Sequence, residues 1–368
     1  MKIAVDARSL SGGKPRGEGK SLLRLYQEIH RQKPDWQIIF FSQADTPAPV
    51  DGIEMRAFDP PGFRFNTWEN FALPWHAWRA HADVLHCSSS SAPRWSPVPI
   101  VMTVHDVIPL VANDGWTDAE TARFERQIRY GLTQAERVIT VSEHTRQDLL
   151  RLFRVARDKL EVVHWGIDPP SEATRTDLTS LGVREPFVIA FGGAARRKNS
   201  ALTVRAAASA ARQLGELQLV MIGVSDVTTR ASLEDEARRA GYDRVLFLQY
   251  IDEPALEALY HGTQCLVYAS LYEGFGLPVL EAMARGVAVV SSNVSSLPEV
   301  AGDAALLIDP GDEAAVAEAI VSVCRDNALR LQLQEKGRAR AARFDWRETA
   351  GRTIAVLEAA ARQLMTSD

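Results

Sequence analysis

The sequence has few cysteines, no long hydrophobic run and no excess of positive charge, and each absence excludes a class of protein. The three cysteines, Cys87, Cys265 and Cys324, form no Cys-x-x-Cys or Cys/His cluster, which argues against a zinc site and against a disulfide framework. They fit a reducing cytoplasm. The net charge of −5 gives no general attraction to nucleic acid, so no nucleic-acid partner is expected.

No uncharged apolar stretch comes near the roughly 20 residues that a membrane-spanning helix needs. Residues 1–6 run straight into a strand-like segment and lack the longer apolar stretch of a signal peptide. We therefore expect a cytoplasmic protein, and peripheral contact with the inner face of the cell membrane stays open. The sequence also lacks an Asp-x-Asp pair, so nothing marks a metal site, and no cofactor is expected.

What is present is an ordinary globular composition in a chain of two-domain length. Apolar residues make up 46% of the chain and charged residues 24%. At 368 residues the chain exceeds the size at which a single core usually splits. Asp168-Pro169-Pro170 and the polar stretch behind it mark a boundary. We predict a first domain over residues 1–170, a second over 186–345, and terminal helices over 346–368 that could pack back on the first domain.

Short apolar runs alternate with helical patterns along the chain. Strands are expected at residues 3–7, 37–41, 83–86, 100–104, 137–141, 160–163, 187–191, 217–222, 245–248, 265–268, 288–291 and 305–307. Helices are expected at residues 20–31, 118–133, 200–214, 254–260, 278–285 and 313–326. This alternation is typical of the α/β class, with parallel sheets covered on both faces. We predict two Rossmann-like doubly wound domains that face a central cleft, with ligands at the carboxyl ends of the strands.

Two glutamates flank a glycine-rich turn that follows the strand expected at 265–268. Glu273 and Glu281 bracket Gly274-Phe275-Gly276-Leu277-Pro278. Because Pro278 suits the first turn of a helix, the amides of the preceding residues would form an N-terminal phosphate site. The spacing alone would be explained more simply by two solvent-exposed glutamates that bind nothing. At a strand-to-helix junction it predicts a site that holds a sugar, a diphosphate and a ribose in a line.

The stretch from Glu273 to Ala284 resembles the Glu-x7-Glu signature of the retaining GT-B glycosyltransferases of family 4. The loop Phe191-Gly192-Gly193-Ala194-Ala195-Arg196-Arg197-Lys198-Asn199 is similar to the Gly-(Ser/Thr)-x-x-x-Arg-Lys-Asn loop of that family. Residues 104–109, 141–146 and 295–304 match further family stretches, so the resemblance covers nearly the whole chain. It implies the GT-B fold, a nucleotide-sugar donor, retention at the anomeric carbon and no metal requirement.

The resemblance also implies roles for individual residues. Glu273 would contact hydroxyls of the transferred sugar, and Glu281 the ribose diol. Arg197 and Lys198 would neutralise the diphosphate, a role that Arg196 could share. The residues expected to be catalytic are Glu273, His105, Arg197 and Lys198. Those expected to bind the donor are Glu281, Gly274, Phe275, Gly276, Leu277, Gly192, Gly193, Arg196, Tyr250 and Ile251.

Several of these residues also have a simpler explanation. His105, at the end of the strand at 100–104, is expected at the donor sugar or the acceptor hydroxyl, and the alternative is a buried structural histidine. Tyr250 and Ile251 could flank the base or simply pack in the core. Ser296 and Glu299 fit a capping box, which is enough to explain both residues.

Two segments of the first half allow more than one interpretation. Gly17-Glu18-Gly19-Lys20-Ser21 suggests a phosphate-binding P-loop, but the position that such a loop requires as glycine is Lys14. We therefore expect Gly17 and Gly19 to form a turn on the acceptor side. Residues 63–81 are rich in aromatics and include Arg64 and Arg79. They suit a membrane interface or a lipid-linked acceptor, or equally a helix face packed on its own domain.

The activity that the resemblance implies is a retaining hexosyl transfer. The Arg-Lys-Asn and His-Asp-Val-Ile-Pro stretches resemble mannosyltransferases, so we expect mannosyl transfer from GDP-mannose. The acceptor would be a saccharide or lipid-linked saccharide in cell-surface polysaccharide synthesis. Two other interpretations remain: another GT-B activity such as nucleotide-sugar epimerisation, and a non-catalytic partner that binds sugar nucleotides.

Overall fold

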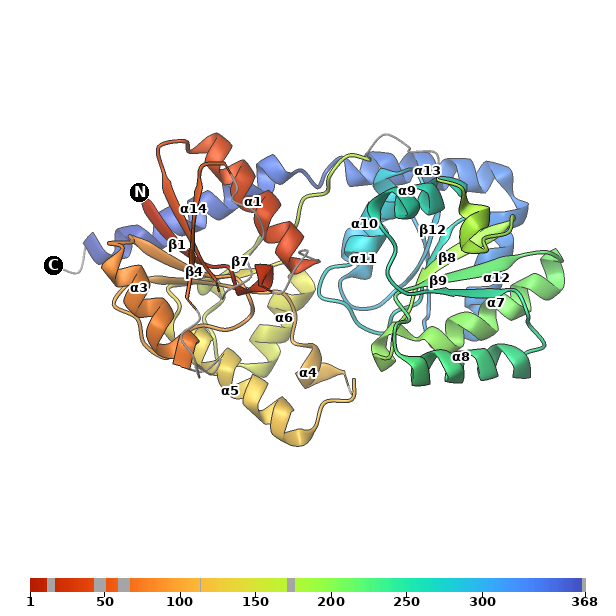
Figure 1. Ribbon diagram of the computed structural model, residues 1–368, viewed down its shortest axis with the longest axis horizontal. Coiled ribbons are helices and arrows are strands. Elements are labelled where there is room, and N and C mark those ends of the chain that lie inside the picture. The colour runs from red at the N-terminus through yellow and green to blue at the C-terminus, as the bar shows by residue number, and fades with distance from the viewer. Residues whose placement is uncertain (12–16, 43–50, 59–66, 113, 171–175, 366–368) are drawn as a thin grey trace. The chain divides into compact units, whose positions relative to one another are not determined.

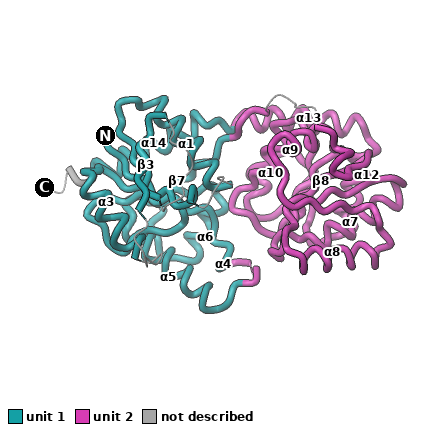
Figure 2. Tube along the Cα trace, viewed as in Figure 1, with its two compact units in different colours: residues 1–110, 116–166, 344–368 teal, residues 111–115, 167–343 magenta. Residues whose placement is uncertain are grey.

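The structure is a computed structural model that describes residues 1–11, 17–42, 51–58, 67–112, 114–170 and 176–365. Contacts divide the chain into two compact units, coloured separately in Figure 2. The first unit consists of Met1–Leu110, Trp116–Gly166 and Phe344–Asp368, and the second of Val111–Gly115 and Ile167–Arg343. Each unit has its own sheet, as the alternating pattern predicts.

The first unit is built on a seven-stranded parallel sheet in the order β3-β2-β1-β4-β5-β6-β7. Its strands are β1 (Lys2–Asp6), β2 (Gln37–Ser42), β3 (Ile53–Ala57), β4 (Val84–Cys87), β5 (Ile100–Val104), β6 (Arg137–Thr140) and β7 (Leu160–Val162). The inner strands are buried along their length, which explains why they read as continuous apolar runs. The sequence pattern did not predict β3, an edge strand in which Glu54 and Arg56 interrupt the apolar residues.

Helices on the faces of this sheet complete the first unit. They include α1 (Glu18–Gln32), α3 (Leu73–Arg79), α4 (Ile108–Val111), α5 (Asp118–Gln134), α6 (Glu143–Leu152) and α14 (Trp346–Met365), together with the π-helical turn η2 (Trp68–Ala72). α14 packs against α1, β4, β5 and β6, and its position beside α1 can be followed in Figure 1. Thr349 of α14 donates a hydrogen bond to the carbonyl of His164 at 2.9 Å.

The aromatic segment does not form the packed helix face that was one of its two interpretations. Trp68 is only 2% exposed, but Phe71, Trp75 and Trp78 are 69%, 53% and 50% exposed. A π-helical turn precedes α3, so the spacing of the four rings does not follow one regular helix. Residues 63–66 of the segment lie outside the described residues. The described part therefore presents three large rings to solvent.

The second unit is built on a six-stranded parallel sheet in the order β10-β9-β8-β11-β12-β13. Its strands are β8 (Phe187–Phe191), β9 (Gln218–Ile222), β10 (Val245–Leu248), β11 (Leu266–Tyr268), β12 (Val289–Ser292) and β13 (Leu306–Ile308). Its α-helices are α7 (Ser200–Leu214), α8 (Val227–Arg239), α9 (Glu253–Gly262), α10 (Leu277–Ala284), α11 (Leu297–Ala301), α12 (Glu313–Arg325) and α13 (Asn327–Ala341).

The core of the second unit depends on an alanine-rich contact between helices. α7 carries five fully or nearly fully buried alanines, and it packs against α12 (Figure 1). Small side chains let two helix backbones approach closely, so that both helices cover the same face of the sheet. The cluster includes Val188 of β8 and Val267 of β11. It fixes the two central strands whose loops carry the site described below.

No helix in the described part of the chain combines the length and the low charge that crossing a bilayer requires.

Candidate functional site

The site in the second unit follows from the order of its central strands. β8, β11 and β12 are neighbours and run parallel, so the loops that follow them leave from the same edge of the sheet. The loop after β8 carries Arg197 and Lys198, and the loop after β11 carries Glu273. The loop after β12 carries Ser295 and Ser296. Residues more than seventy positions apart are thereby brought within hydrogen-bond distance.

Glu273 is the centre of this arrangement. Its Oε1 atom accepts hydrogen bonds from Arg197 Nη1 at 2.9 Å, Lys198 Nζ at 2.8 Å and the hydroxyl of Tyr268 at 2.9 Å. The residue is 9% exposed. Burial alone would raise the pKa of the Glu273 carboxyl, but the charges of Lys198 and Arg197 outweigh it and lower the pKa below its usual value. Glu273 is therefore ionised at neutral pH.

Tyr268, the last residue of β11, is a member of the site that the sequence motifs did not mark. Burial and the neighbouring Glu273 raise the pKa of its phenol well above the usual value, so the hydroxyl keeps its proton and donates it. Lys198 Nζ also lies 3.0 Å from this hydroxyl and 5.2 Å from the centre of the ring. Tyr268 thus holds Glu273 and Lys198 in one geometry.

Arg197 has a second carboxylate partner that the sequence also did not mark. Asp114 belongs to the short segment Val111–Gly115 that groups with the second unit. Its Oδ1 accepts a hydrogen bond from the Arg197 amide at 2.9 Å, and its Oδ2 lies 3.0 Å from Arg197 Nε. By contrast, Arg196 is exposed, and no contact of its side chain is recorded within the described residues. The geometry therefore selects Arg197 over Arg196 as the arginine beside Glu273.

Two serines after β12 hold the backbone of the glutamate loop. Ser295 Oγ accepts a hydrogen bond from the Glu273 amide at 3.1 Å. Ser296 Oγ lies 2.9 Å from the carbonyl of Glu273 and 2.8 Å from that of Phe275, and it is fully buried. The expected capping box of Ser296 and Glu299 is wrong, since Ser296 makes no side-chain cap to α11. Its hydroxyl donates to the glutamate loop instead.

The helix α10 begins where the glycine-rich turn ends. Gly276 has φ 111°, a left-handed conformation, and a Cβ atom there would lie 2.7 Å from Leu297 Cδ2, so only glycine fits. Pro278 occupies the first turn. In the part of the chain that is described, no acceptor is recorded for the amides of Gly276 and Leu277. The turn therefore presents these two backbone N–H groups at a helix N-terminus, and Phe275 and Gly274 lie just before them.

Glu281 lies one turn inside α10 and is half-buried. Its Oε2 accepts a hydrogen bond from the hydroxyl of Tyr260 at 3.1 Å. Burial and the charge of Glu281 raise the pKa of the Tyr260 phenol well above its usual value, so this hydroxyl also stays protonated. Glu281 is therefore held by a buried tyrosine, as Glu273 is held by Tyr268.

The remaining candidates of this unit lie at the ends of other strands. Gly192 and Gly193 follow β8, and the space beside Gly193 is open, because a Cβ atom there would meet nothing within 4 Å. Tyr250 follows the edge strand β10 and is 62% exposed, with Ile251 beside it and half-buried. Among the described residues, no contact joins these two to Glu273, because β10 lies three strands away from β11 in the sheet.

A second cluster of candidates lies in the first unit, where β1, β4 and β5 are neighbours. His105 follows β5, and its Nε2 lies 2.7 Å from the carbonyl of Ser88 and 3.3 Å from Glu18 Oε1. Because a carbonyl can only accept, Nε2 carries a hydrogen. The ring stacks on Trp165 with centroids 5.7 Å apart. His105 is therefore fixed in orientation and tautomer.

Glu18 is the strongest influence that raises the pKa of this histidine. Burial alone would lower the pKa of His105, but the Glu18 carboxylate outweighs it and raises the pKa. Reciprocally, burial would raise the pKa of Glu18, whereas His105 and a 2.6 Å hydrogen bond from Ser89 lower it. The sequence placed Glu18 only inside a glycine turn. Gly17 caps α1 with φ 42°, Gly19 is buried in the helix, and Lys14 lies outside the described residues.

Within the described residues, no group of three or more His, Cys, Asp or Glu side chains is placed to hold a metal ion.

Comparison with known proteins shows the family to which the chain belongs. The model of Glycosyltransferase Family 4 matches residues 15–171, and that of Glycosyl transferases group 1 matches residues 179–340. O-antigen chain mannosyltransferase B of Escherichia coli is 31% identical over 270 residues, which cover 69% of this chain and 68% of that protein.

Solved structures agree in fold. Sucrose-phosphate synthase from Thermosynechococcus elongatus matches with a TM-score of 0.76 and 22% identity over 100% of both chains. Anabaena HepE in complex with UDP and glucose matches with a TM-score of 0.74 and 18% identity over 98% of this chain and 100% of that one. The two parallel α/β sheets are those of the GT-B fold. The chain therefore belongs to the group 1 glycosyltransferases of family 4.

Proposed function

We propose that this protein is a retaining hexosyltransferase that moves a mannosyl group from GDP-mannose to a saccharide or lipid-linked saccharide in cell-surface polysaccharide synthesis. The donor site is proposed chiefly on the buried carboxylate of Glu273. The guanidinium of Arg197 and the ammonium of Lys198 contact it at the same oxygen. A carboxylate, two cations and a helix N-terminus within one loop cluster suit a substrate that carries both hydroxyls and a diphosphate.

Each part of the donor has a matching group in this cluster. Within the described residues, the side-chain hydrogen bonds of Glu273 fall on Oε1, so its Oε2 is the oxygen that would accept a hydrogen bond from a sugar hydroxyl. Arg197, Lys198 and the amides of Gly276 and Leu277 would hold the diphosphate. Glu281 would accept from the ribose diol. HepE, a protein of the same fold, was solved with UDP and glucose, which supports a nucleotide sugar as the donor.

The chemistry that we propose needs no metal and no covalent intermediate. As the glycosidic bond breaks, negative charge builds on the diphosphate, and Arg197 and Lys198 would stabilise it. Glu273 is a poor nucleophile, because its charge is already shared with two cations. The acceptor hydroxyl would then attack from the face of the leaving group and pass its proton to the departing phosphate. Retention at the anomeric carbon follows.

The choice of mannose rests on relatives. The 31% identical protein is named as an O-antigen chain mannosyltransferase, and the Arg197-Lys198-Asn199 stretch resembles mannosyltransferases. An acceptor in cell-surface polysaccharide synthesis is proposed on the same ground. For the first unit, we propose that His105 contacts the sugar and that the turn of Gly17 and Gly19 lies on the acceptor side.

A panel of nucleotide sugars tests the proposal. The purified protein is heated with GDP-mannose, GDP-fucose, UDP-glucose, dTDP-glucose and ADP-glucose, because a ligand that binds only the folded state raises the melting temperature. The stabilising donor is then incubated with candidate acceptors, and released nucleotide and product are measured. We expect GDP-mannose to stabilise the protein and to be consumed. Glu273→Gln should abolish turnover, whereas Glu318→Gln, an exposed glutamate on α12, should not.

The proposal would be overturned by near wild-type turnover in Glu273→Gln. If only another donor stabilises the protein, GDP-mannose is rejected as the donor, but the proposed transferase activity is not. Isomerisation of the donor without an acceptor would instead identify an epimerase.

A further inference from the structure

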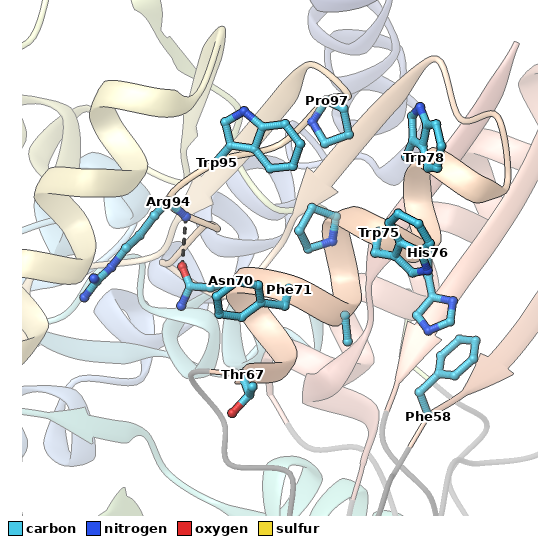
Figure 3. A pocket seen from close by; sticks show the side chains of 12 residues that line it. Phe58, Thr67, Asn70, Phe71, Trp75, His76, Trp78, Arg94, Trp95 and Pro97 are labelled. Carbon is cyan, nitrogen blue, oxygen red and sulfur yellow. Dashed lines mark hydrogen bonds between the residues drawn. The ribbon is translucent and has the colours of Figure 1, made fainter.

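The first unit has a hollow lined by aromatic rings, which the donor site does not use. It has a volume of about 1130 Å³. Phe71, Trp75 and Trp78 come from η2 and α3, and Trp95 comes from the loop after β4 (Figure 3). These four side chains are between 50% and 69% exposed. So much exposed aromatic surface in one place marks an interaction site.

The hollow has a defined wall, because its two segments are joined. Asn70 Oδ1 of η2 accepts a hydrogen bond from the amide of Arg94 at 2.9 Å, as the dashed line in Figure 3 shows. Beneath η2, Glu69 is buried and paired with Arg8 at 3.1 Å, and Arg8 lies 5.6 Å from the ring of Trp68. The turn that carries Phe71 and leads into α3 is therefore held in place by the interior of the unit.

A smaller, cationic pocket of about 150 Å³ adjoins the hollow. The two share Asn70 and Arg94, and the smaller one is lined in addition by Arg123, Arg126 and Tyr130 of α5. The Arg94 guanidinium lies 4.8 Å from the centre of the Tyr130 ring. Glu69, the acidic residue that lines this pocket, is already paired with Arg8. The side chains that line this pocket therefore carry more positive than negative charge.

We propose that this combined surface binds the face of an anionic phospholipid bilayer, with an acyl chain in the aromatic hollow and the lipid phosphate at Arg94, Arg123 and Arg126. Tryptophan rings favour the boundary between hydrocarbon and headgroups, and arginines lie at the headgroup level beside them. Each basic side chain near an anionic surface adds to the binding. The concave shape accepts a chain, and the neighbouring cations select an anionic headgroup.

Charge also distinguishes this occupant from a second copy of the chain. A symmetric contact between copies that is centred on this surface would bring the same arginines towards one another, where like charges repel. An anionic bilayer supplies the opposite charge. The inference concerns a surface of the first unit alone and does not depend on the identity of the donor.

Sedimentation with sucrose-loaded vesicles tests the proposal on the full chain, without donor or acceptor. Vesicles of equal parts phosphatidylglycerol and phosphatidylcholine should sediment the protein, and vesicles of phosphatidylcholine alone should do so at least about tenfold more weakly. Rising salt should release the protein from the mixed vesicles, because charge attraction is screened. Inorganic phosphate at the same charge concentration should not compete effectively, because it lacks the acyl chain.

Two pairs of substitutions separate the apolar half from the cationic half. Trp75→Ser with Trp95→Ser should weaken binding to the mixed vesicles by about tenfold or more. Arg123→Gln with Arg126→Gln should have a similar effect on the mixed vesicles and little effect on phosphatidylcholine. The matched controls are Trp116→Ser, a 46% exposed tryptophan outside both pockets, and Arg238→Gln with Arg239→Gln on α8. Neither control should change binding.

All altered side chains are exposed, so melting temperatures should stay close to that of the unaltered chain and loss of binding can be assigned to the surface. Failure to sediment with any vesicle would overturn the proposal. Equal binding to both vesicle types would also overturn it. So would a result in which Trp75→Ser with Trp95→Ser dissociates an oligomer in analytical ultracentrifugation and leaves vesicle binding unchanged, since a second copy would then occupy the hollow.

Discussion

Glu18 Oε1 lies 3.3 Å from His105 Nε2, and this contact makes the pKa of the histidine depend on the first residue of α1. The ring is also held by Ser88 and Trp165, so it cannot turn away when the pair changes protonation. The protonation of His105, a candidate site residue, therefore depends on pH through one identified partner, Glu18.

Glu18→Gln should lower the pKa of His105, because the carboxylate is the largest influence that raises it. The imidazole signals in NMR spectra recorded across pH report this pKa directly. Glu28→Gln, on the same helix and paired with Arg31, is the control and should leave the pKa unchanged. An unchanged His105 pKa in Glu18→Gln would contradict the assignment.

The same pair should stabilise the fold within a limited range of pH. A raised His105 pKa adds stability that is complete below its ordinary value of 6.5 and is lost as pH rises through the folded value. A lowered Glu18 pKa adds stability that is complete above its ordinary value of 4.5 and is lost as pH falls through the folded value. The melting-temperature loss in Glu18→Gln should therefore be largest between pH 4.5 and 6.5. A loss that grows steadily above that range would contradict the sign.

The two cations beside Glu273 should account for most of the affinity for the diphosphate. Arg197→Gln and Lys198→Gln should each weaken binding of the nucleoside diphosphate roughly tenfold or more, since a hydrogen bond to a charged group is lost. Glutamine keeps a donor for Glu273, which limits the damage to the fold. Titration calorimetry measures the affinity. Arg196→Gln is the adjacent control, and an equal loss there would show that the geometry has selected the wrong arginine.

The contact that we propose between Glu281 and the ribose can be separated from a general loss of binding. Glu281→Gln should weaken binding of the ribonucleoside diphosphate about tenfold and leave its 2′,3′-dideoxy analogue almost unaffected. Tyr260→Phe removes the hydroxyl that holds Glu281 and keeps the carboxylate, so it should cause a smaller loss. If both nucleotides lose affinity equally in Glu281→Gln, the carboxylate does not contact the ribose.

Ser296 should matter for turnover although it is fully buried and is not among the residues proposed to contact the substrate. Ser296→Ala leaves the carbonyls of Glu273 and Phe275 without their buried donor, which should cost about 1 to 2 kcal/mol of stability. It should also lower kcat more than it raises KM, because it displaces the backbone of Glu273. Ser296→Thr should restore part of both. Ser180→Ala, at an exposed hydroxyl bonded to the carbonyl of Asp177, is the control and should change neither.

Much of the fold could be predicted from the sequence where burial is uniform. β5, β8, β10 and α7 have the predicted bounds. The first two strands are inner strands of parallel sheets, which read as unbroken apolar runs, and Gly215 follows α7 and ends its helical pattern. The edge strand β3 and the π-helical η2 were missed, because neither has the period of a regular buried element.

The candidate site could be predicted in its motif residues but not in their partners. Glu273, Arg197 and Lys198 stand in recognisable stretches, whereas Tyr268 reads as the last residue of an apolar strand. Asp114 and Ser296 meet the site only through contacts across 83 and 23 positions of sequence. The sequence around Ser296 predicts a local helix cap, because the two carbonyls that it contacts lie more than twenty positions away along the chain.

The packing of α14 on the first unit has a consequence for synthesis of the protein. Its residues leave the ribosome after the whole of the second unit, yet they cover β4, β5 and β6, which leave it early. The second unit, apart from Val111–Gly115, is one continuous stretch and can bury its core as soon as it emerges. Part of the sheet of the first unit therefore stays uncovered until α14 has been synthesised.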